Sequence, residues 1–394
     1  AKKMMPSKPN KPKINPRQMV AGGKADELYE LICATGYIPD ESNFSDFCQS
    51  LLSGFALLAT GNPGSGKTVF SDAVYEACNL DYFTVTGRDE LRQEEILCSW
   101  DAGEQEFFMR EARAVIASYP EETRPQALDE FRRKRFTPEF LILGEVAAAY
   151  QKAQESRFPT LLRLDEVDKF GAGIEDALLS PLAAGVIYVE RLECGFVGCT
   201  DAEFLPIVIS TSNDSRHELS LPFRDRHLHT YFATPGLDKE LEILRARCPE
   251  ISSANLSNAL KLLDAIRSVA GLSHYPSVRT GIQLARAFER DTVEEITERN
   301  VEVYFTYFAK NRRDALYLKK QLPYLLSCVQ TFHSQIDGWL MTRDPNWERH
   351  WAKRRGLNDV FREKQFAEAE ADSSVFEESG NVFQNDFSFS RRAI

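Results

Sequence analysis

Short apolar runs recur along the first part of the chain, each followed by a polar or glycine-containing segment. They lie at 55–60, 80–86, 160–165, 206–211 and 228–233. Runs of this length, rich in β-branched and aromatic side chains, are typical of buried strands. Helical patterns lie between them, and strands that alternate with helices form a parallel sheet because each helix returns the chain across the sheet. The pattern predicts an α/β core at 19–235 with a parallel five-stranded sheet.

The segments around this core show other patterns. Helical periodicity at 236–325 predicts an α-helical lid domain that follows the core. A charged helical stretch at 88–157 is longer than one crossover helix needs, and it forms either solvated helices or a contact surface for a pore or partner. Residues 1–18 hold six Lys or Arg, four Pro and no acidic residue, which predicts a flexible basic tail.

The C-terminal part divides in two by composition. Residues 326–370 are predicted to form a helical extension, and 371–394, rich in Ser, Asp and Glu, a disordered tail. Tryptophans in the extension lie among basic residues, a combination that either binds nucleic acid or packs helices that have a solvated face. Phenylalanines in the tail either dock into a groove of a partner or neighbouring subunit, or pack back on the lid.

A glycine-rich motif follows the first predicted strand and fits the pattern GxxxxGK[ST]. Its residues are Gly61, Asn62, Pro63, Gly64, Ser65, Gly66, Lys67 and Thr68. The glycines let the backbone turn N–H groups toward phosphate oxygens, and the following helix adds partial positive charge at its N-terminus. A purely structural turn is the alternative, but strand, motif and helix follow in the order that ATP binding requires. We predict that Lys67 reaches the β- and γ-phosphates and that Thr68 ligates Mg²⁺.

Two adjacent carboxylates end the third predicted strand, in the sequence LLRLDEVDKF. Adjacent like charges repel, so such a pair is favoured only where something positive or reactive faces it. With a phosphate-binding motif upstream, Asp165 is predicted to hold Mg²⁺ and Glu166 to polarise the water that attacks the γ-phosphate; the alternative is a plain strand end. Arg163, inside the same apolar run, must pair or reach solvent, either with a carboxylate of the helical stretch or at a neighbouring subunit.

These motifs resemble those of AAA+ ATPases. LLRLDEVDKF is similar to their DExD Walker B motif, and residues 186–235 resemble the MoxR branch, in which a β-hairpin precedes a strand that ends in TSN and a short helix then ends in arginine. The segments PGLDKELEILRARCPEI and HYPSVRTGIQLARAF resemble the lid of CoxD-like MoxR proteins. The resemblance covers roughly residues 30–325 and implies a P-loop AAA+ core followed by an α-helical lid.

The resemblance also implies roles for four further residues. Asn213 matches sensor 1, whose amide orients water between the γ-phosphate and Glu166; otherwise it only ends a strand. Arg226 matches the arginine finger that one subunit inserts into the active site of the next, and Arg224 is the alternative candidate. Otherwise either arginine only forms an ion pair at the surface. Arg279 falls where the lid supplies a sensor 2 arginine, in a region where CoxD-like sequences are irregular.

The function that the resemblance implies is ATP hydrolysis coupled to protein remodelling or maturation by a hexameric homo-oligomer, often with a von Willebrand A-domain protein as partner and a protein as client. One rival is a nucleic-acid-associated AAA+ motor or defence ATPase. The formal net charge of −11, from 48 Lys and Arg against 59 Asp and Glu, counts against nucleic-acid binding over the whole surface but leaves room for a local basic patch. The other rival is a nucleotide-gated scaffold that does not hydrolyse ATP, against which the complete motif set argues.

Bulk properties add the expected location. The 394 residues are 43% hydrophobic, and their longest apolar runs are far shorter than a membrane span, which needs roughly 20 residues. The basic, proline-rich N-terminal stretch has no apolar segment behind it, so no signal peptide is predicted. Eight cysteines form no CxxC pair and no zinc spacing, which indicates reduced thiols and predicts a cytoplasmic protein.

Overall fold

The computed structural model describes residues 5–8, 11–213 and 217–330. The chain divides into two units, Ala1–Leu326 and Ser327–Ile394, and the first is described below. The helical extension predicted at 326–370 lies outside the described residues except at its start, and so does the whole tail with its four phenylalanines.

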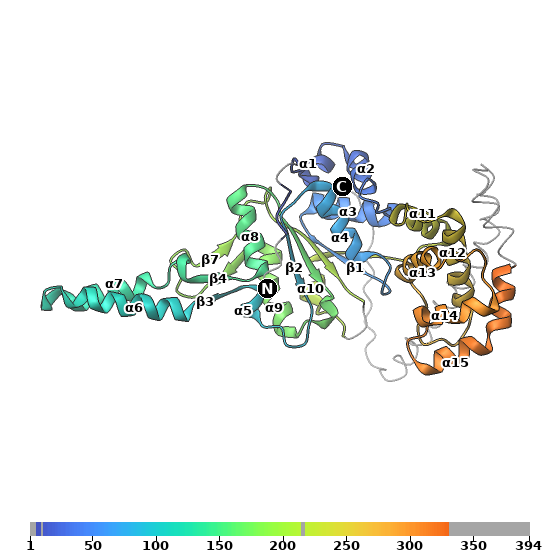
Figure 1. The fold of residues 1–394 in the computed structure, drawn as a ribbon. Coiled ribbons are helices and arrows are strands. Elements are labelled where there is room, and N and C mark those ends of the chain that lie inside the picture. The colour runs from blue at the N-terminus through green and yellow to red at the C-terminus, as the bar shows by residue number, and fades with distance from the viewer. Residues whose placement is uncertain (1–4, 9–10, 214–216, 331–394) are drawn as a thin grey trace, which may run out of the picture. The chain divides into compact units, whose positions relative to one another are not determined.

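A five-stranded parallel sheet forms the centre of the first unit (Figure 1). Its strands lie in the order β2-β5-β8-β1-β9, and every neighbouring pair is parallel. Their bounds are β1 Ala56–Thr60, β2 Tyr82–Thr86, β5 Leu161–Asp165, β8 Ile207–Thr211 and β9 His227–Tyr231. Each overlaps a run predicted from the sequence, although β9 begins one residue earlier and ends two residues earlier than its run, so the predicted α/β fold is confirmed.

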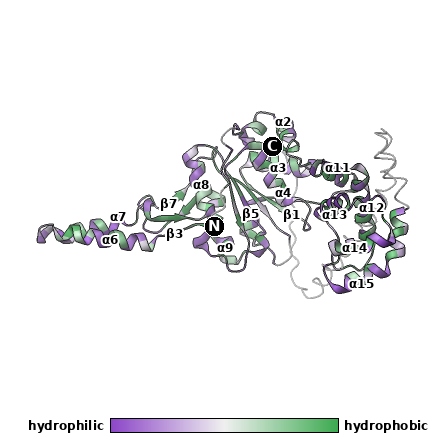
Figure 2. Ribbon diagram, in the orientation of Figure 1, coloured by the Kyte–Doolittle hydropathy of each residue, from purple (hydrophilic) through white to green (hydrophobic). Residues whose placement is uncertain are grey.

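Helices cover both faces of the sheet, and alternate residues of each strand serve the two faces. Leu58, Leu162 and Leu164 pack in one hydrophobic cluster with residues of α8 (Glu145–Ser156) and α9 (Ala172–Ala184). The intervening residues of the same strands, such as Leu57, Leu161 and Ile209, pack on the other face. There they meet α2, α3 and α4, whose bounds are Ala25–Cys33, Glu41–Ser53 and Lys67–Cys78. Figure 2 shows hydrophobic residues along the central strand β1, which is buried at every position.

In the sequence between β2 and β5, the chain forms a small antiparallel ribbon that continues into a helical hairpin (Figure 1). The ribbon is β3 (Cys98–Trp100) paired with β4 (Leu141–Leu143), and the hairpin is α6 (Ala102–Ala117) with α7 (Arg124–Lys134). The short helix α5 (Gln93–Ile96) precedes it. The two long helices share a small hydrophobic cluster of their own. The sequence predicted the helices but not the ribbon, because three-residue strands are too short to show a period.

A second β-hairpin and a short helix lead into the last strand. β6 (Val186–Tyr188) pairs with β7 (Phe196–Gly198) before β8, and α10 (Leu221–Arg224) precedes β9. The order of hairpin, strand, short helix and strand agrees with the order that the resemblance implied. The described helices include none that is both long and apolar enough to cross a bilayer.

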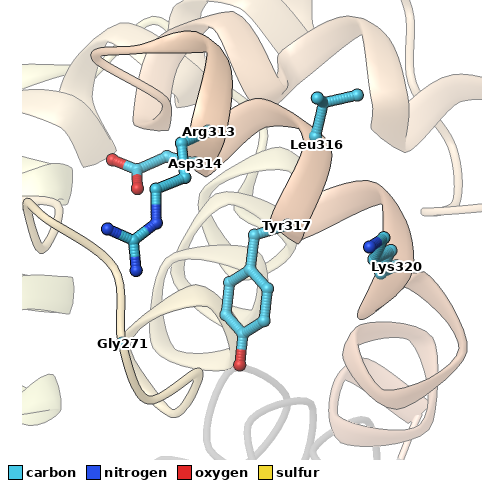
Figure 3. Close-up of a pocket in the computed structure, with 6 residues that line it drawn as sticks. All are labelled: Gly271, Arg313, Asp314, Leu316, Tyr317 and Lys320. Atoms are coloured by element: carbon cyan, nitrogen blue, oxygen red, sulfur yellow. The ribbon is translucent and has the colours of Figure 1, made fainter.

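Within the described residues, five helices follow the sheet, in the region that the sequence predicted to be the lid. They are α11 Leu237–Arg247, α12 Ser253–Arg267, α13 Val278–Arg290, α14 Glu298–Phe308 and α15 Arg312–Lys320. Helix α12 is buried along most of its length. Arg267 in α12 donates two 2.7 Å hydrogen bonds to the fully buried Glu240 carboxylate in α11, which locks the two helices together. A pocket of about 510 Å³ opens beside α15 and Gly271, where Arg313, Tyr317 and Lys320 line it (Figure 3).

The described part of the N-terminal segment differs from the flexible tail that its composition predicted. Met5 pairs with Tyr82 on the outer edge of β2. Ser7 N and Lys13 Nζ donate to the Asp81 carboxylate at 2.9 and 2.7 Å, and Asn15 caps helix α1 (Pro16–Ala21). An edge strand offers unpaired backbone groups, and Asp81 offers an anion for the basic segment, so this segment covers the edge.

His227 links the start of β9 to the strand β8. It is buried; its Nδ1–H donates to Phe223 O at 2.8 Å, and its Nε2 accepts from Ser210 Oγ at 2.8 Å, because a carbonyl can only accept. Burial lowers the pKa of the His227 imidazole to about 4. The folded chain therefore keeps this side chain neutral well below the pH at which an unfolded histidine takes up a proton.

Acid should destabilise the fold through His227. Between its folded pKa of about 4 and an unfolded value near 6.5, the unfolded chain binds one more proton, so the free energy of unfolding falls by about 2 kcal/mol from pH 7.5 to pH 5. In His227→Gln, the free energy of unfolding should fall by about 2 kcal/mol less over this pH range. In His229→Gln, at an exposed position of the same strand, it should fall as much as in wild type. Urea unfolding of the three proteins at both pH values measures this. An unchanged decrease in His227→Gln would contradict the assignment.

Candidate active site

The glycine-rich loop joins β1 to α4 and needs glycine for steric reasons. Gly61, Gly64 and Gly66 have φ angles of 138°, 83° and 102°, in the region that favours glycine. A Cβ atom at Gly61 would lie 2.4 Å from Phe232 O in the residue that follows β9. The loop thus passes close to the end of the neighbouring strand, and its backbone has the turns that a phosphate-binding loop needs.

Lys67 is the first residue of α4 and lies inside the curve of the loop. Its Nζ donates to Gly61 O at 2.6 Å and to Asn62 O at 2.9 Å, with Ser65 Oγ at 3.4 Å. Only 6% of the residue is exposed. A buried cation is costly unless polar groups surround it, and here the loop carbonyls do so. The loop therefore holds a positive charge among its own carbonyl groups.

Asp165 meets the P-loop helix at the end of β5. Thr68 Oγ1 donates to Asp165 Oδ1 at 3.3 Å, which joins residues 97 positions apart in the chain. Thr211 Oγ1, at the end of β8, hydrogen-bonds to the same oxygen and accepts from Glu166 N at 3.0 Å. Thr211 thus connects the two carboxylate residues. Sequence reasoning missed this role, although Thr211 is the first residue of the TSN motif.

Glu166 follows in a left-handed backbone conformation, with φ of 55°. A non-glycine residue there is strained by about 1–3 kcal/mol, and such strain occurs often at functional sites. The Glu166 Oε2 atom accepts from Lys169 Nζ at 2.6 Å. Gly87, after β2, is also constrained, because a Cβ there would lie 2.1 Å from Glu166 O. No local pattern in the sequence marks Gly87 or Lys169 as part of the site.

Asn213 lies just beyond β8, and its backbone is tied to the loop after β5. Asn213 N donates to Asp168 Oδ1 at 3.2 Å, and Asp168 is fully buried. Asp168 is the final acid of the DExD pattern, to which sequence reasoning assigned no role. Its carboxylate connects the loop of Asn213 with the loop of Glu166. Asn213 thus lies at the same end of the sheet as Asp165.

The two candidate finger arginines differ in their surroundings. Arg226 is half-buried, and its guanidinium donates to Leu179 O at 3.0 Å and Pro222 O at 2.6 Å, both carbonyls of its own chain. Arg224 is exposed and pairs with Glu218 at 2.9 Å. Within the described residues neither arginine has a hydrogen bond to the P-loop. Neither arginine is therefore part of the hydrogen-bonded group of P-loop, Asp165 and Glu166 residues described above.

The start of α13 brings the lid to the P-loop. A Cβ atom at Gly64 would lie 2.5 Å from Ser277 Cβ, the N-cap of α13. Arg279, two residues later, is exposed on the first turn of this helix. Arg267 Nε donates to Pro276 O at 2.8 Å, so the buried ion pair of the lid also fixes the segment that contacts Gly64. Sequence reasoning identified Arg279 but missed Ser277.

Oxygen ligands for a magnesium ion are present where Thr68 meets Asp165. A hydroxyl and a carboxylate oxygen 3.3 Å apart suit this hard cation, which takes one or two protein oxygens together with phosphate oxygens and water. The part of the chain that the structure describes has no group of three His, Cys, Asp or Glu that could hold a metal by itself. The residues therefore fit Mg²⁺ bound together with a nucleotide.

A match to one protein-family model agrees with this geometry. Residues 56–227 match the family model of the AAA domain (dynein-related subfamily). No curated protein matches the chain. Among solved structures, the chain is similar to the RuvB Holliday junction branch migration motor of Thermotoga maritima, with 13% identity and a TM-score of 0.37 over 68% of this chain and 69% of that one. The family match includes the P-loop, Asp165 and Glu166. Residues 56–227 are therefore an AAA domain, and the chain has the P-loop fold of the AAA+ ATPases.

Proposed function

We propose that this chain is an ATP-hydrolysing AAA+ protein of the MoxR type that acts as an oligomeric remodelling or maturation chaperone. The observation that supports hydrolysis best is the contact of Asp165 Oδ1 with Thr68 of the P-loop helix, with Glu166 next in the chain. The support for the MoxR type is the order of hairpin, TSN strand, short arginine helix and helical lid.

Nucleotide binding would use the loop residues 61–66 and the first residues of α4. Their N–H groups and the N-terminus of α4 would face the phosphates. Lys67 Nζ would exchange its contacts with Gly61 O and Asn62 O for phosphate oxygens. Thr68 and Asp165 would hold Mg²⁺, which neutralises phosphate charge when bound. The contact of Ser277 with Gly64 would let the lid respond to the nucleotide.

Hydrolysis would need a base and an oriented water molecule. Glu166 would accept the proton of the water whose oxygen attacks the γ-phosphorus, while the bond from that phosphorus to the β–γ bridging oxygen breaks and ADP leaves. Thr211 and Asp168 would act as positioning residues, because they hold the backbone of Glu166 and Asn213. The Asn213 amide would orient the water between Glu166 and the phosphate.

Assembly and partners are part of the same proposal. A finger arginine would act from a neighbouring subunit, with Arg226 as first choice, and Arg279 would act as sensor 2 from the lid. A hexamer, a protein client and a von Willebrand A-domain partner follow from the MoxR resemblance alone, and a cytoplasmic location follows from the pattern of cysteines. The net charge of −11 makes a nucleic-acid partner the less favoured reading.

Substitution of the two central residues should separate ATP binding from hydrolysis. Lys67→Ala should abolish ATP binding, because it removes the cation at the phosphates. Glu166→Gln should bind ATP but hydrolyse it at least ~100-fold more slowly, because it lacks the base. Equilibrium binding and phosphate release measure the two steps, with the exposed Lys24→Ala as control. Equal hydrolysis by Glu166→Gln and wild type would refute the assignment of Glu166.

The same two variants test the remodelling function. With ATP present, affinity capture with Glu166→Gln should retain a protein client that Lys67→Ala does not retain. Capture of DNA or RNA by Glu166→Gln, together with hydrolysis that nucleic acid stimulates, would instead favour the nucleic-acid motor. A Glu166→Gln protein that binds ATP and captures no protein would contradict the chaperone proposal.

The proposed finger predicts a dependence on assembly. If Arg226 acts across an interface, specific ATPase activity should rise with protein concentration, and Arg226→Ala should lose most of it. Mixing Arg226→Ala with Glu166→Gln should restore some turnover, because some interfaces then combine both intact groups. Arg224→Ala is the matched control, since it removes the nearby exposed arginine. Full activity of Arg226→Ala would make that residue structural, and loss in Arg224→Ala would assign the role there.

A further inference from the structure

Arg163 lies beside Asp165, although the apolar run around it gives no reason for a cation. The two residues are two positions apart in β5, so their side chains project from the same face of the sheet, the face that α4 covers. Only 12% of the Arg163 side chain and 16% of the Asp165 side chain are exposed. Neither the predicted contact with the helical stretch nor a subunit contact is needed to explain this arginine.

The Arg163 guanidinium is held by the P-loop helix and by β2. Nη1 donates to Asp72 Oδ1 at 2.8 Å and to Ser71 Oγ at 3.3 Å, both in α4. Nε donates to Thr84 Oγ1 at 3.2 Å, and the guanidinium lies 5.3 Å from the centre of the Tyr82 ring. Tyr82 Oη in turn donates to Asp72 Oδ1 at 2.9 Å, so the Asp72 carboxylate has two partners.

The contact between Arg163 and Asp165 is longer than these hydrogen bonds. Arg163 Nε lies 3.8 Å from Asp165 Oδ2, which is an ion-pair distance but not a hydrogen bond. The other oxygen, Oδ1, is the one that Thr68 and Thr211 contact. Arg163 therefore neutralises the Asp165 carboxylate only in part, because its hydrogen bonds go to Asp72, Ser71 and Thr84 instead.

We propose that Asp72 is a positioning residue that keeps Arg163 from closing on Asp165, and that it thereby preserves the affinity of Asp165 for Mg²⁺. This inference rests on the proposed ATPase function. If Asp72 lost its charge, Arg163 would turn to Asp165, and a distance of about 2.8 Å instead of 3.8 Å would strengthen their attraction. At an effective dielectric constant near 20, that change corresponds to roughly tenfold weaker binding of a competing cation.

A purely structural ion pair would behave differently. Asp72 is 51% exposed, and exposed pairs contribute little to stability. Glu76, one turn further along α4, is also 51% exposed and pairs with Lys8 at 3.3 Å, yet it has no contact with Arg163. Loss of one surface carboxylate at either position would change the overall charge equally. Only Asp72 would change the surroundings of Asp165.

The test measures how much Mg²⁺ is needed for half-maximal binding of a fluorescent ATP analogue. Asp72→Asn should need about tenfold more than wild type, and Glu76→Gln should match wild type. Arg163→Met should need no more than wild type, and the double variant Asp72→Asn with Arg163→Met should return to the requirement of Arg163→Met. Thermal midpoints without nucleotide show which variants fold. If Arg163→Met does not fold, Asp72→Asn against Glu76→Gln decides the question.

Two results would overturn the inference alone. The first is a Mg²⁺ requirement of Asp72→Asn equal to that of wild type or of Glu76→Gln. The second is a double variant that still needs the high Mg²⁺ concentration of Asp72→Asn, because the effect would then not pass through Arg163. Failure of the wild type to bind the analogue would instead overturn the proposed function, and this inference with it.

Discussion

A single oxygen atom, Asp165 Oδ1, joins the separate parts of the candidate active site. Thr68, at the start of the P-loop helix, and Thr211, at the end of β8, both hydrogen-bond to it. Thr211 also holds the backbone N–H of Glu166. A shift of α4 against the sheet would therefore change the surroundings of both carboxylates. The positions of the phosphate-binding loop, the proposed magnesium ligand and the proposed base depend on this one junction.

The parallel sheet makes this junction possible. The carboxyl ends of β1, β5 and β8 lie at one edge of the sheet, so residues from three distant parts of the sequence meet there. The alternation of side chains along β5 then places Arg163 behind Asp165 on the face that α4 covers. Asp72 in α4 forms the shorter ion pair with that arginine, at 2.8 Å. The same geometry that positions a carboxylate for a cation thus also places a competing cation close to it.

Much of the core could be predicted because strong local signals mark it. The GxxxxGK[ST] motif and the apolar runs act within a few residues, and the observed strands coincide with those runs. The ribbon of β3 and β4 could not be predicted, since its pairing joins three-residue segments that have no period of their own. The partners of Arg163 also depend on the pairing of β2 with β5 and on the packing of α4. Thr211, Asp168 and Ser277 act through contacts across the fold, which local patterns do not encode.

We propose that the Asp165 junction supports magnesium-dependent ATP hydrolysis. The most direct measurement is phosphate release by wild type and by Asp165→Asn over a range of Mg²⁺ concentrations, with circular dichroism as the check on folding. Asn keeps the size of the side chain and its contacts with Thr68 and Thr211 but removes the charge. Turnover in wild type should require Mg²⁺, and the folded variant should lose about 100-fold or more of it. Turnover by Asp165→Asn at the wild-type rate would contradict it.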